Sequence, residues 1–181
     1  RLFLVVVAVS IIAGCGSGEE TAPPAVPAVE LDPEDSTILK RPFTAEQIRD
    51  EWVEGFTLTM RRTTPEGEVT ERWAVLEADE EGATIEFLTL EGPDDSAGQS
   101  ATSRTSWVGL RDHATYSPDS ATREEVVRET PMGTLEGWLY TVREEAEGTV
   151  TEYFFARDLP GAPAYVRTMR GDEIVLEMMQ L

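Results

Sequence analysis

Cysteine and histidine are almost absent from this sequence of 181 residues, in which Cys15 and His113 are the single examples. One cysteine cannot form a disulfide within the chain, so the fold must depend on its hydrophobic core. A catalytic zinc site usually takes several histidine or cysteine ligands, which this sequence cannot supply. It also has no glycine-rich phosphate loop before a helix. We therefore expect no metal and no cofactor.

Basic residues are scarce as well. Lysine and arginine number 15 against 35 aspartates and glutamates, which gives a formal net charge of −20. Binding of nucleic acid is disfavoured, because it depends on neutralising phosphates. Anionic lipid headgroups would repel the domain too, so any contact with a membrane should be made through a lipid anchor. The acidity alone indicates a solvated surface rather than a binding site.

Long apolar runs are missing except for a short one at the start of the chain. It extends from Leu2 to Ala13, well short of the roughly 20 residues that span a bilayer as a helix. The small residues Ala13 and Gly14 suit a signal peptidase, and no cluster of charges follows to stop transfer. These features predict a signal peptide over residues 1–14. The alternatives to a lipoprotein signal are an ordinary secretory signal and a buried apolar segment with a chance cysteine.

The tetrapeptide Ile12-Ala13-Gly14-Cys15 resembles the lipobox of bacterial lipoproteins. In that family the chain is cut before the cysteine, whose thiol then carries a diacylglycerol. The resemblance implies lipidation of Cys15 and a stable anchor in the bacterial cell envelope. Two acyl chains bind a protein stably to a membrane, whereas one chain gives only marginal binding. An aspartate after the cysteine often retains such proteins at the inner membrane. Here Gly16 follows, which favours the outer membrane, facing the periplasm, if the cell has one.

Residues 16–42 are rich in proline, glycine and acidic side chains and show no apolar periodicity. Such a stretch cannot bury enough surface to offset the entropy lost on ordering it. We therefore predict a lipidated, disordered tether over residues 15–42 and a single folded domain over residues 43–181.

The folded domain is expected to begin with a short helix over residues 45–53. Thr44 is a suitable N-cap, and Gln47 three residues later completes a capping box. Ile48 and Trp52 lie one turn apart, so both occupy the same face of this helix.

From residue 55 onward, alternating polar and apolar residues separated by turn residues predict β-strands. The expected strands are 56–61, 68–77, 83–91, 105–110, 125–130, 135–144, 149–157, 164–169 and 173–181. Their connections are too short for helical crossovers, which favours antiparallel pairing. The fold class is thus all-β: an antiparallel meander of about eight or nine strands that forms a curved sheet, half-barrel or small barrel. One short N-terminal helix accompanies it.

Aromatic residues give the only indication of a ligand site. Trp138 and Tyr140 share one face of their strand, Tyr153 and Phe155 share one face of the next, and both strands are bulky on both faces. We expect Tyr153 and Phe155 to line a wall for an apolar ligand, with Trp138 and Tyr140 as further candidates, while the helix packs on the opposite face through Phe154. A well-packed core of amphipathic aromatics is the alternative.

Segments 129–133, 138–140 and 155–161 resemble uncharacterised periplasmic β-domain lipoproteins, whose half-barrel is similar to the Lol-type lipoprotein-carrier fold. The resemblance covers roughly the last 50 residues and includes no catalytic motif. It therefore implies a fold more than a function.

The expected function is that of a non-enzymatic envelope lipoprotein whose domain binds an apolar ligand or a protein partner. A structural or assembly module without a ligand pocket is the first alternative. A carboxylate-based hydrolase is the second. His113 has Asp112 and Ser117 nearby, but a catalytic triad is recognised by geometry in space, so we expect an ordinary surface histidine. A continuous apolar cavity would favour ligand binding, whereas clustered buried carboxylates with shifted pKa values would favour the hydrolase.

Overall fold

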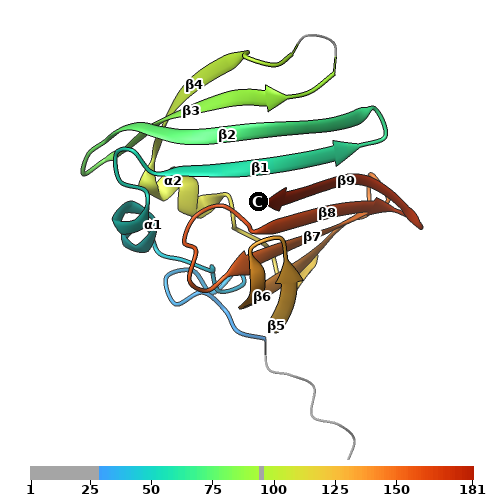
Figure 1. Cartoon of the computed structure of the whole chain (residues 1–181). Helices are drawn as coiled ribbons and strands as arrows, with labels where there is room; N and C mark the ends of the chain where they lie inside the picture. The colour runs from blue at the N-terminus through green and yellow to red at the C-terminus, as the bar shows by residue number, and fades with distance from the viewer. Residues whose placement is uncertain (1–28, 94–95) are drawn as a thin grey trace, which may run out of the picture.

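One antiparallel sheet of nine strands forms the body of the structure, a computed structural model that describes residues 29–93 and 96–181. The strand order is β4-β3-β2-β1-β9-β8-β7-β6-β5. The sheet is curved and unclosed, with β4 and β5 at its edges (Figure 1). The predicted all-β antiparallel meander is confirmed, and of the forms expected for it the open curved sheet is the one observed. The predicted signal peptide and Cys15 lie outside the described residues.

The elements have the following bounds: α1 Ala45–Glu51, β1 Thr57–Thr64, β2 Gly67–Ala78, β3 Gly82–Glu91, β4 Ser100–Ser106, α2 Trp107–Asp112, β5 Ala121–Thr130, β6 Gly133–Glu144, β7 Thr149–Ala156, β8 Tyr165–Arg170 and β9 Glu173–Gln180.

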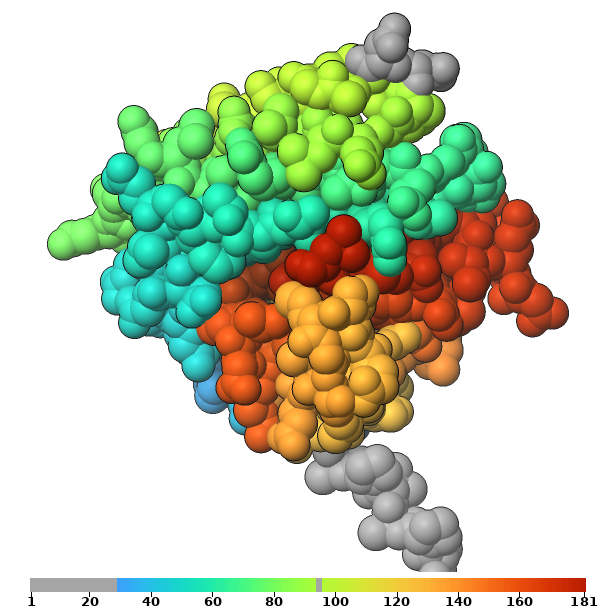
Figure 2. Space-filling model, viewed as in Figure 1, coloured from blue at the N-terminus to red at the C-terminus, as the bar shows by residue number. Residues whose placement is uncertain are grey.

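Most neighbouring strands are also neighbours along the chain. The exception is β1, which pairs with β2 on one side and with β9 on the other, where Met60 lies opposite Gln180. The β9 strand therefore joins β1–β4 to β5–β8. In the space-filling view the red end of the chain lies between the green strands and the orange β5–β6 hairpin (Figure 2).

The main hydrophobic core lies between the two helices and one face of the sheet, which we call the helix-covered face. Trp52, directly after α1, and Trp107 of α2 are buried there. Strand residues from both halves of the sheet join them, such as Ile85 of β3 and Phe155 of β7. Because α1 and Phe155 belong to this one cluster, the expectation that the helix packs through Phe154 is wrong.

Phe154 instead belongs to a second, smaller core on the opposite face of β6–β8. It packs there with Ala164 and Tyr165, beneath Leu139 of β6 and Leu159 of the β7–β8 loop. Adjacent residues of a strand point to opposite faces, so each face of β7 is buried in a different core. The bulky side chains on both faces of these strands are explained by these two cores.

The α1 helix follows its sequence signals closely. The Thr44 hydroxyl accepts a hydrogen bond from the Gln47 backbone N–H at 3.2 Å, and the Gln47 side chain accepts one from the Thr44 N–H at 2.9 Å. The predicted capping box is thus present. The helix ends at Glu51, and Trp52 is its C-cap.

The expected strand over residues 105–110 is wrong, because a second helix, α2, begins at Trp107. The Ser106 hydroxyl caps this helix by accepting a hydrogen bond from the Gly109 N–H at 3.0 Å. The indole N–H of Trp107 donates to the Asp79 carbonyl at 2.9 Å, which fixes the helix to the β2–β3 turn. Strand β4 precedes it and pairs with β3 from Ser100 to Ser106, so only residues 105 and 106 of the expected strand are in a strand.

The ordered chain also begins earlier than Phe43, so the predicted disordered tether is too long. Leu31 and Leu39 form an isolated antiparallel bridge, and Leu39, only 2 % exposed, joins the main core. The Leu39 N–H donates to the Tyr116 carbonyl at 2.9 Å. Composition averaged over residues 16–42 hides Ile38 and Leu39, whose burial helps to offset the cost of ordering the segment.

Candidate functional site

An apolar cavity of about 330 Å³ lies on the helix-covered face of the sheet, beside strands β2, β3 and β4. Its apolar wall comes from both helical regions and from the sheet. The large side chains of this wall are Trp52, Trp73, Ile85, Phe87 and Leu110. The cavity therefore has the size and the apolar lining of a small-ligand site.

The β2–β3 hairpin places two of these aromatic rings together. Trp73 and Phe87 lie directly opposite each other in the strand register, and their rings meet edge to face with centroids 5.1 Å apart. Val75 and Ile85 form the next pair on the same face. Because side chains alternate between the two faces of a strand, both pairs point toward the helices.

The opposite wall is built around Trp52 and the β7–β8 loop. The indole N–H of Trp52 donates to the Pro160 carbonyl at 2.8 Å, and its ring stacks on Phe56 with centroids 5.3 Å apart. Gly161 has a φ of +113°, and a Cβ at this position would lie 2.5 Å from the Trp52 Nε1. Only glycine allows this approach, so the loop is held tightly against the indole.

Polar groups in the cavity wall are few, and none of them is a carboxylate, an ammonium or a guanidinium group. They include the hydroxyls of Ser103 and Thr105 on the edge strand β4 and the imidazole of His113, the C-cap residue of α2. The His113 Nδ1 lies 2.7 Å from the Gly109 carbonyl oxygen. Among the described residues that line the cavity, none is an aspartate, glutamate, lysine or arginine.

The four aromatic residues predicted from the sequence to bind a ligand lie together, but in the core. Trp138, Tyr140, Tyr153 and Phe155 all belong to the main cluster, and none of the four lines the cavity. Phe43 packs edge to face against Trp138 and Phe155, with centroids 5.8 and 6.3 Å apart. The structure therefore fits the alternative of a well-packed core at these positions.

Tyr116 covers the remaining two of these aromatic rings, and its own centroid lies 5.0 Å from that of Tyr140 and 5.4 Å from that of Tyr153. The Tyr140 hydroxyl donates to the Lys40 carbonyl at 2.5 Å and accepts from Arg123 Nε at 3.1 Å. Burial raises the pKa of Tyr140 to about 12, although the Arg123 guanidinium opposes this rise. Through these contacts Tyr140 joins the N-terminal segment to the sheet.

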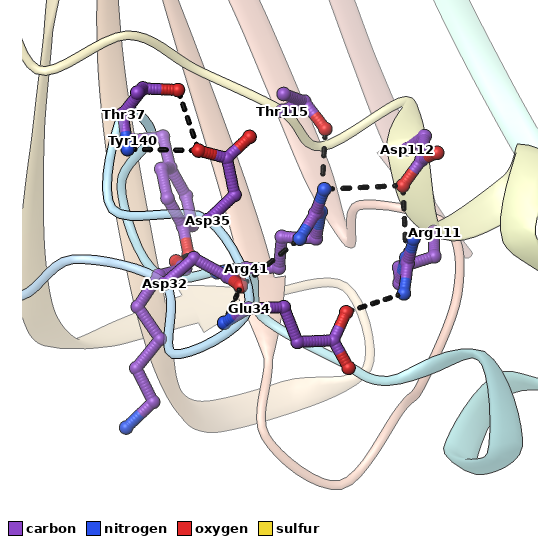
Figure 3. A network of polar contacts seen from close by, with 10 residues as sticks. Asp32, Glu34, Asp35, Thr37, Arg41, Arg111, Asp112, Thr115 and Tyr140 are labelled. Atoms are coloured by element: carbon purple, nitrogen blue, oxygen red, sulfur yellow. Dashed lines mark hydrogen bonds and ion pairs between the residues drawn. The ribbon is translucent and has the colours of Figure 1, made fainter.

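A polar network fastens residues 29–41 to the C-terminal end of α2 (Figure 3). Arg41 pairs with Asp32 at 3.1 Å and with Asp112 at 3.4 Å, and Arg111 pairs with Glu34 at 2.9 Å. Asp112 also accepts from Arg111 at 2.9 Å. Because His113 follows these two residues directly, the network also holds the end of α2 that borders the cavity.

Asp32 is the buried carboxylate of this network, and its charge is compensated. Burial disfavours its ionised form, but hydrogen bonds from the Arg41 and Glu34 backbone N–H groups and the charge of Arg41 outweigh that effect. The pKa of Asp32 therefore lies below its ordinary value. A carboxylate held ionised by such partners serves to fix the segment, whereas a general acid needs a raised pKa.

A scan against models of protein families finds no match, and a search of curated proteins finds none either. Within residues 29–93 and 96–181, no helix has the length and apolar character needed to cross a membrane. The same part of the chain contains no group of three or more histidine, cysteine, aspartate or glutamate residues arranged to hold a metal ion.

Proposed function

We propose that this chain is a lipid-anchored lipoprotein of the bacterial envelope, without enzymatic activity, whose β domain binds a small apolar ligand. The observation that carries the proposal is the apolar cavity of about 330 Å³. Aspartate, glutamate, lysine and arginine make up 28 % of the sequence, yet none of the described lining residues is among them. A wall of indole, phenyl and aliphatic groups with a few polar atoms is typical of a site for an apolar molecule.

The anchor in this proposal is a diacylglyceryl group on Cys15, with the outer membrane favoured if the cell has one. Residues 16–28 separate Cys15 from the described domain and can span at most about 45 Å when fully extended. The domain would thus stay close to the membrane surface. The sequence as a whole has a net charge of −20, which disfavours contact with anionic headgroups, so the lipid makes the contact.

Probe binding tests the proposed cavity. The chain from residue 16 onward contains every described residue but lacks the acyl chains that could compete for the cavity. We expect it to bind the neutral fluorophore N-phenyl-1-naphthylamine saturably. Energy transfer from tryptophan should accompany binding, because Trp52 and Trp73 line the cavity. A folded chain that shows no saturable binding would contradict the proposal.

A matched pair of variants locates the bound probe. Ser103 lines the cavity, and the adjacent Thr102 points to the other face of the same edge strand. Both residues are exposed, so either position should accept a large side chain. We expect Ser103→Trp to fill the cavity mouth and weaken probe binding at least about tenfold, a change of 1.4 kcal/mol. Thr102→Trp should leave the dissociation constant unchanged, and equal effects of the two would argue against binding in this cavity.

An assembly module that binds a protein partner is the second candidate, and the free edge at β4 favours it. Of the seven residues in this strand only Arg104 is charged, whereas natural edge strands are commonly protected by charge. A strand of a partner could add to this edge through backbone hydrogen bonds. Replacing Thr102 by proline should abolish such pairing, which crosslinking in the native host would detect.

A further inference from the structure

We propose that the ligand of this cavity is a neutral lipid or alcohol with a hydroxyl group, and that His113 accepts the hydrogen bond from that hydroxyl. The inference rests on the proposed function and specifies the chemical class of the ligand.

The lack of lysine and arginine among the described lining residues argues against an anionic headgroup. A carboxylate or phosphate in this cavity would have no lysine or arginine to pair with among the described lining residues. Removing an unpaired charge from water is costly. The chain as a whole carries a net charge of −20, which repels anions further. A neutral ligand avoids both costs.

The hydrogen bond at His113 determines what the imidazole can offer. The Gly109 carbonyl oxygen, 2.7 Å from Nδ1, can only accept, so Nδ1 must carry a proton. In the neutral ring Nε2 then has no proton and is an acceptor. A ligand hydroxyl can donate to it, whereas an ether, a ketone or a hydrocarbon cannot.

The backbone that carries the exposed His113 side chain is held in place by its surroundings. His113 is the C-cap of α2, a helix tied at its start by the bond from Trp107 to Asp79 and at its end by the ion pairs of Arg111. An acceptor that is already in place loses little entropy when a ligand binds.

The hydroxyls of β4 complement this acceptor. Ser103 and Thr105 line the same cavity and can donate to the ligand oxygen. An alcohol oxygen both donates and accepts, so it can satisfy the imidazole and a β4 hydroxyl at once. The remaining wall of Trp73, Phe87 and Leu110 requires the rest of the ligand to be hydrocarbon.

Two isomers with the formula C₁₀H₂₂O provide the test. 1-Decanol and nonyl methyl ether have the same atoms, but only the alcohol can donate a hydrogen bond. Each is titrated against the chain from residue 16 onward loaded with N-phenyl-1-naphthylamine. We expect decanol to displace the probe at a concentration about three- to tenfold lower than the ether does, the range expected for one neutral hydrogen bond.

Two further measurements assign this preference to the histidine. His113→Phe keeps an aromatic ring and removes the acceptor, so the preference for decanol over the ether should disappear. Both isomers are titrated against the same variant, so a change in its probe affinity does not affect this comparison. Because His113 is the only histidine in the sequence, ¹⁵N-histidine labelling gives the Nδ1 and Nε2 signals of one imidazole in the unmutated chain. The Nε2 resonance should shift with decanol and not with the ether.

Equal displacement by the two isomers, or a preference that survives in His113→Phe, would overturn the inference while leaving the cavity proposal intact. Stronger displacement by decanoate than by decanol would also overturn it, in favour of an anionic ligand. Failure of the probe itself to bind would instead refute the proposed function, and the inference with it.

Discussion

Gly161 is the residue whose replacement is expected to cost most for its size. Alanine there would adopt an unfavourable φ of +113° and place its Cβ against the Trp52 indole. We expect Gly161→Ala to lower the free energy of unfolding by about 3 kcal/mol, measured by urea denaturation. Gly171 also has a positive φ, of +59°, but has nothing within 4 Å of an added Cβ. Gly171→Ala should therefore cost only about 1 kcal/mol, and an equal loss in both variants would contradict the role of the Trp52 contact.

The tyrosines predict how stability depends on alkaline pH. Burial raises the pKa of Tyr140 and of Tyr165 to about 12, from about 10 in an unfolded chain. The folded state binds these phenol protons more tightly than the unfolded state does. Their contribution to the free energy of unfolding is therefore complete below pH 10 and is lost as the pH rises from 10 through 12. Unfolding free energies measured between pH 8 and 12 should be level and then fall. In Tyr140→Phe the fall should be shallower, and an unchanged slope would contradict the assigned pKa.

At the scale of the element, the N-terminal segment over residues 29–41 depends on its buried carboxylate. Asp32→Asn removes the charge that Arg41 and two backbone N–H groups satisfy. We expect a loss of about 2 kcal/mol in unfolding free energy, typical of hydrogen bonds to a charged group, and faster amide hydrogen exchange at Leu39.

The matched control for this variant is Asp35→Asn. Asp35 is exposed, and its hydrogen bonds are to Thr37 within its own turn. This substitution should leave both stability and exchange at Leu39 close to those of the unmodified chain. Similar effects of the two substitutions would indicate that surface charge, rather than the buried pair, holds the segment.

The lowered pKa of Asp32 also gives an acid limit. A folded-state pKa below the unfolded one stabilises the fold above the unfolded value of about 3.9, and this contribution is lost as the pH falls through the folded-state pKa. We therefore expect the difference in stability between the unmodified chain and Asp32→Asn to shrink below pH 4.

The elements that could be predicted from the sequence are those with a clear pattern of apolar residues or a clear capping motif. Half-buried strands such as β1 and β2 alternate between polar and apolar residues, and α1 carries a full capping box. In contrast, α2 has only six residues, too few to distinguish a helix from a strand by pattern, although Ser106 and Gly109 carry its N-cap. Strand β4 is almost entirely exposed, so it has no buried face and no alternation to read.

The site was harder to predict, because its walls come from distant parts of the chain. The hydrogen bond between Trp52 and Pro160 joins residues 108 positions apart. The aromatic pair of the cavity wall could have been predicted, because the register of the β2–β3 hairpin places Trp73 opposite Phe87. The place of His113 in the cavity wall depends on the α2 helix, which was not predicted from the sequence.

For the whole molecule, the predicted anchor is tested directly in cells. A serine hydroxyl cannot take the place of the thiol that accepts the diacylglyceryl group, so Cys15→Ser should abolish labelling by a clickable fatty acid. The protein should then leave the membrane fraction. Ser17→Ala, two residues further on, should keep both the label and the membrane location. Equal labelling of Cys15→Ser and the unmodified chain would refute the lipoprotein proposal.

The pairing of β1 with β9 has a consequence for the order of folding. Strands β1–β4 and β5–β9 can each assemble from adjacent hairpins, whereas the contact between Arg61 and Met179 joins residues 118 positions apart. Closing so long a loop costs more entropy and is slow. We expect the two halves to form early and the β1–β9 seam to form last. Until β9 has been synthesised, the chain therefore lacks the strand that joins its two halves.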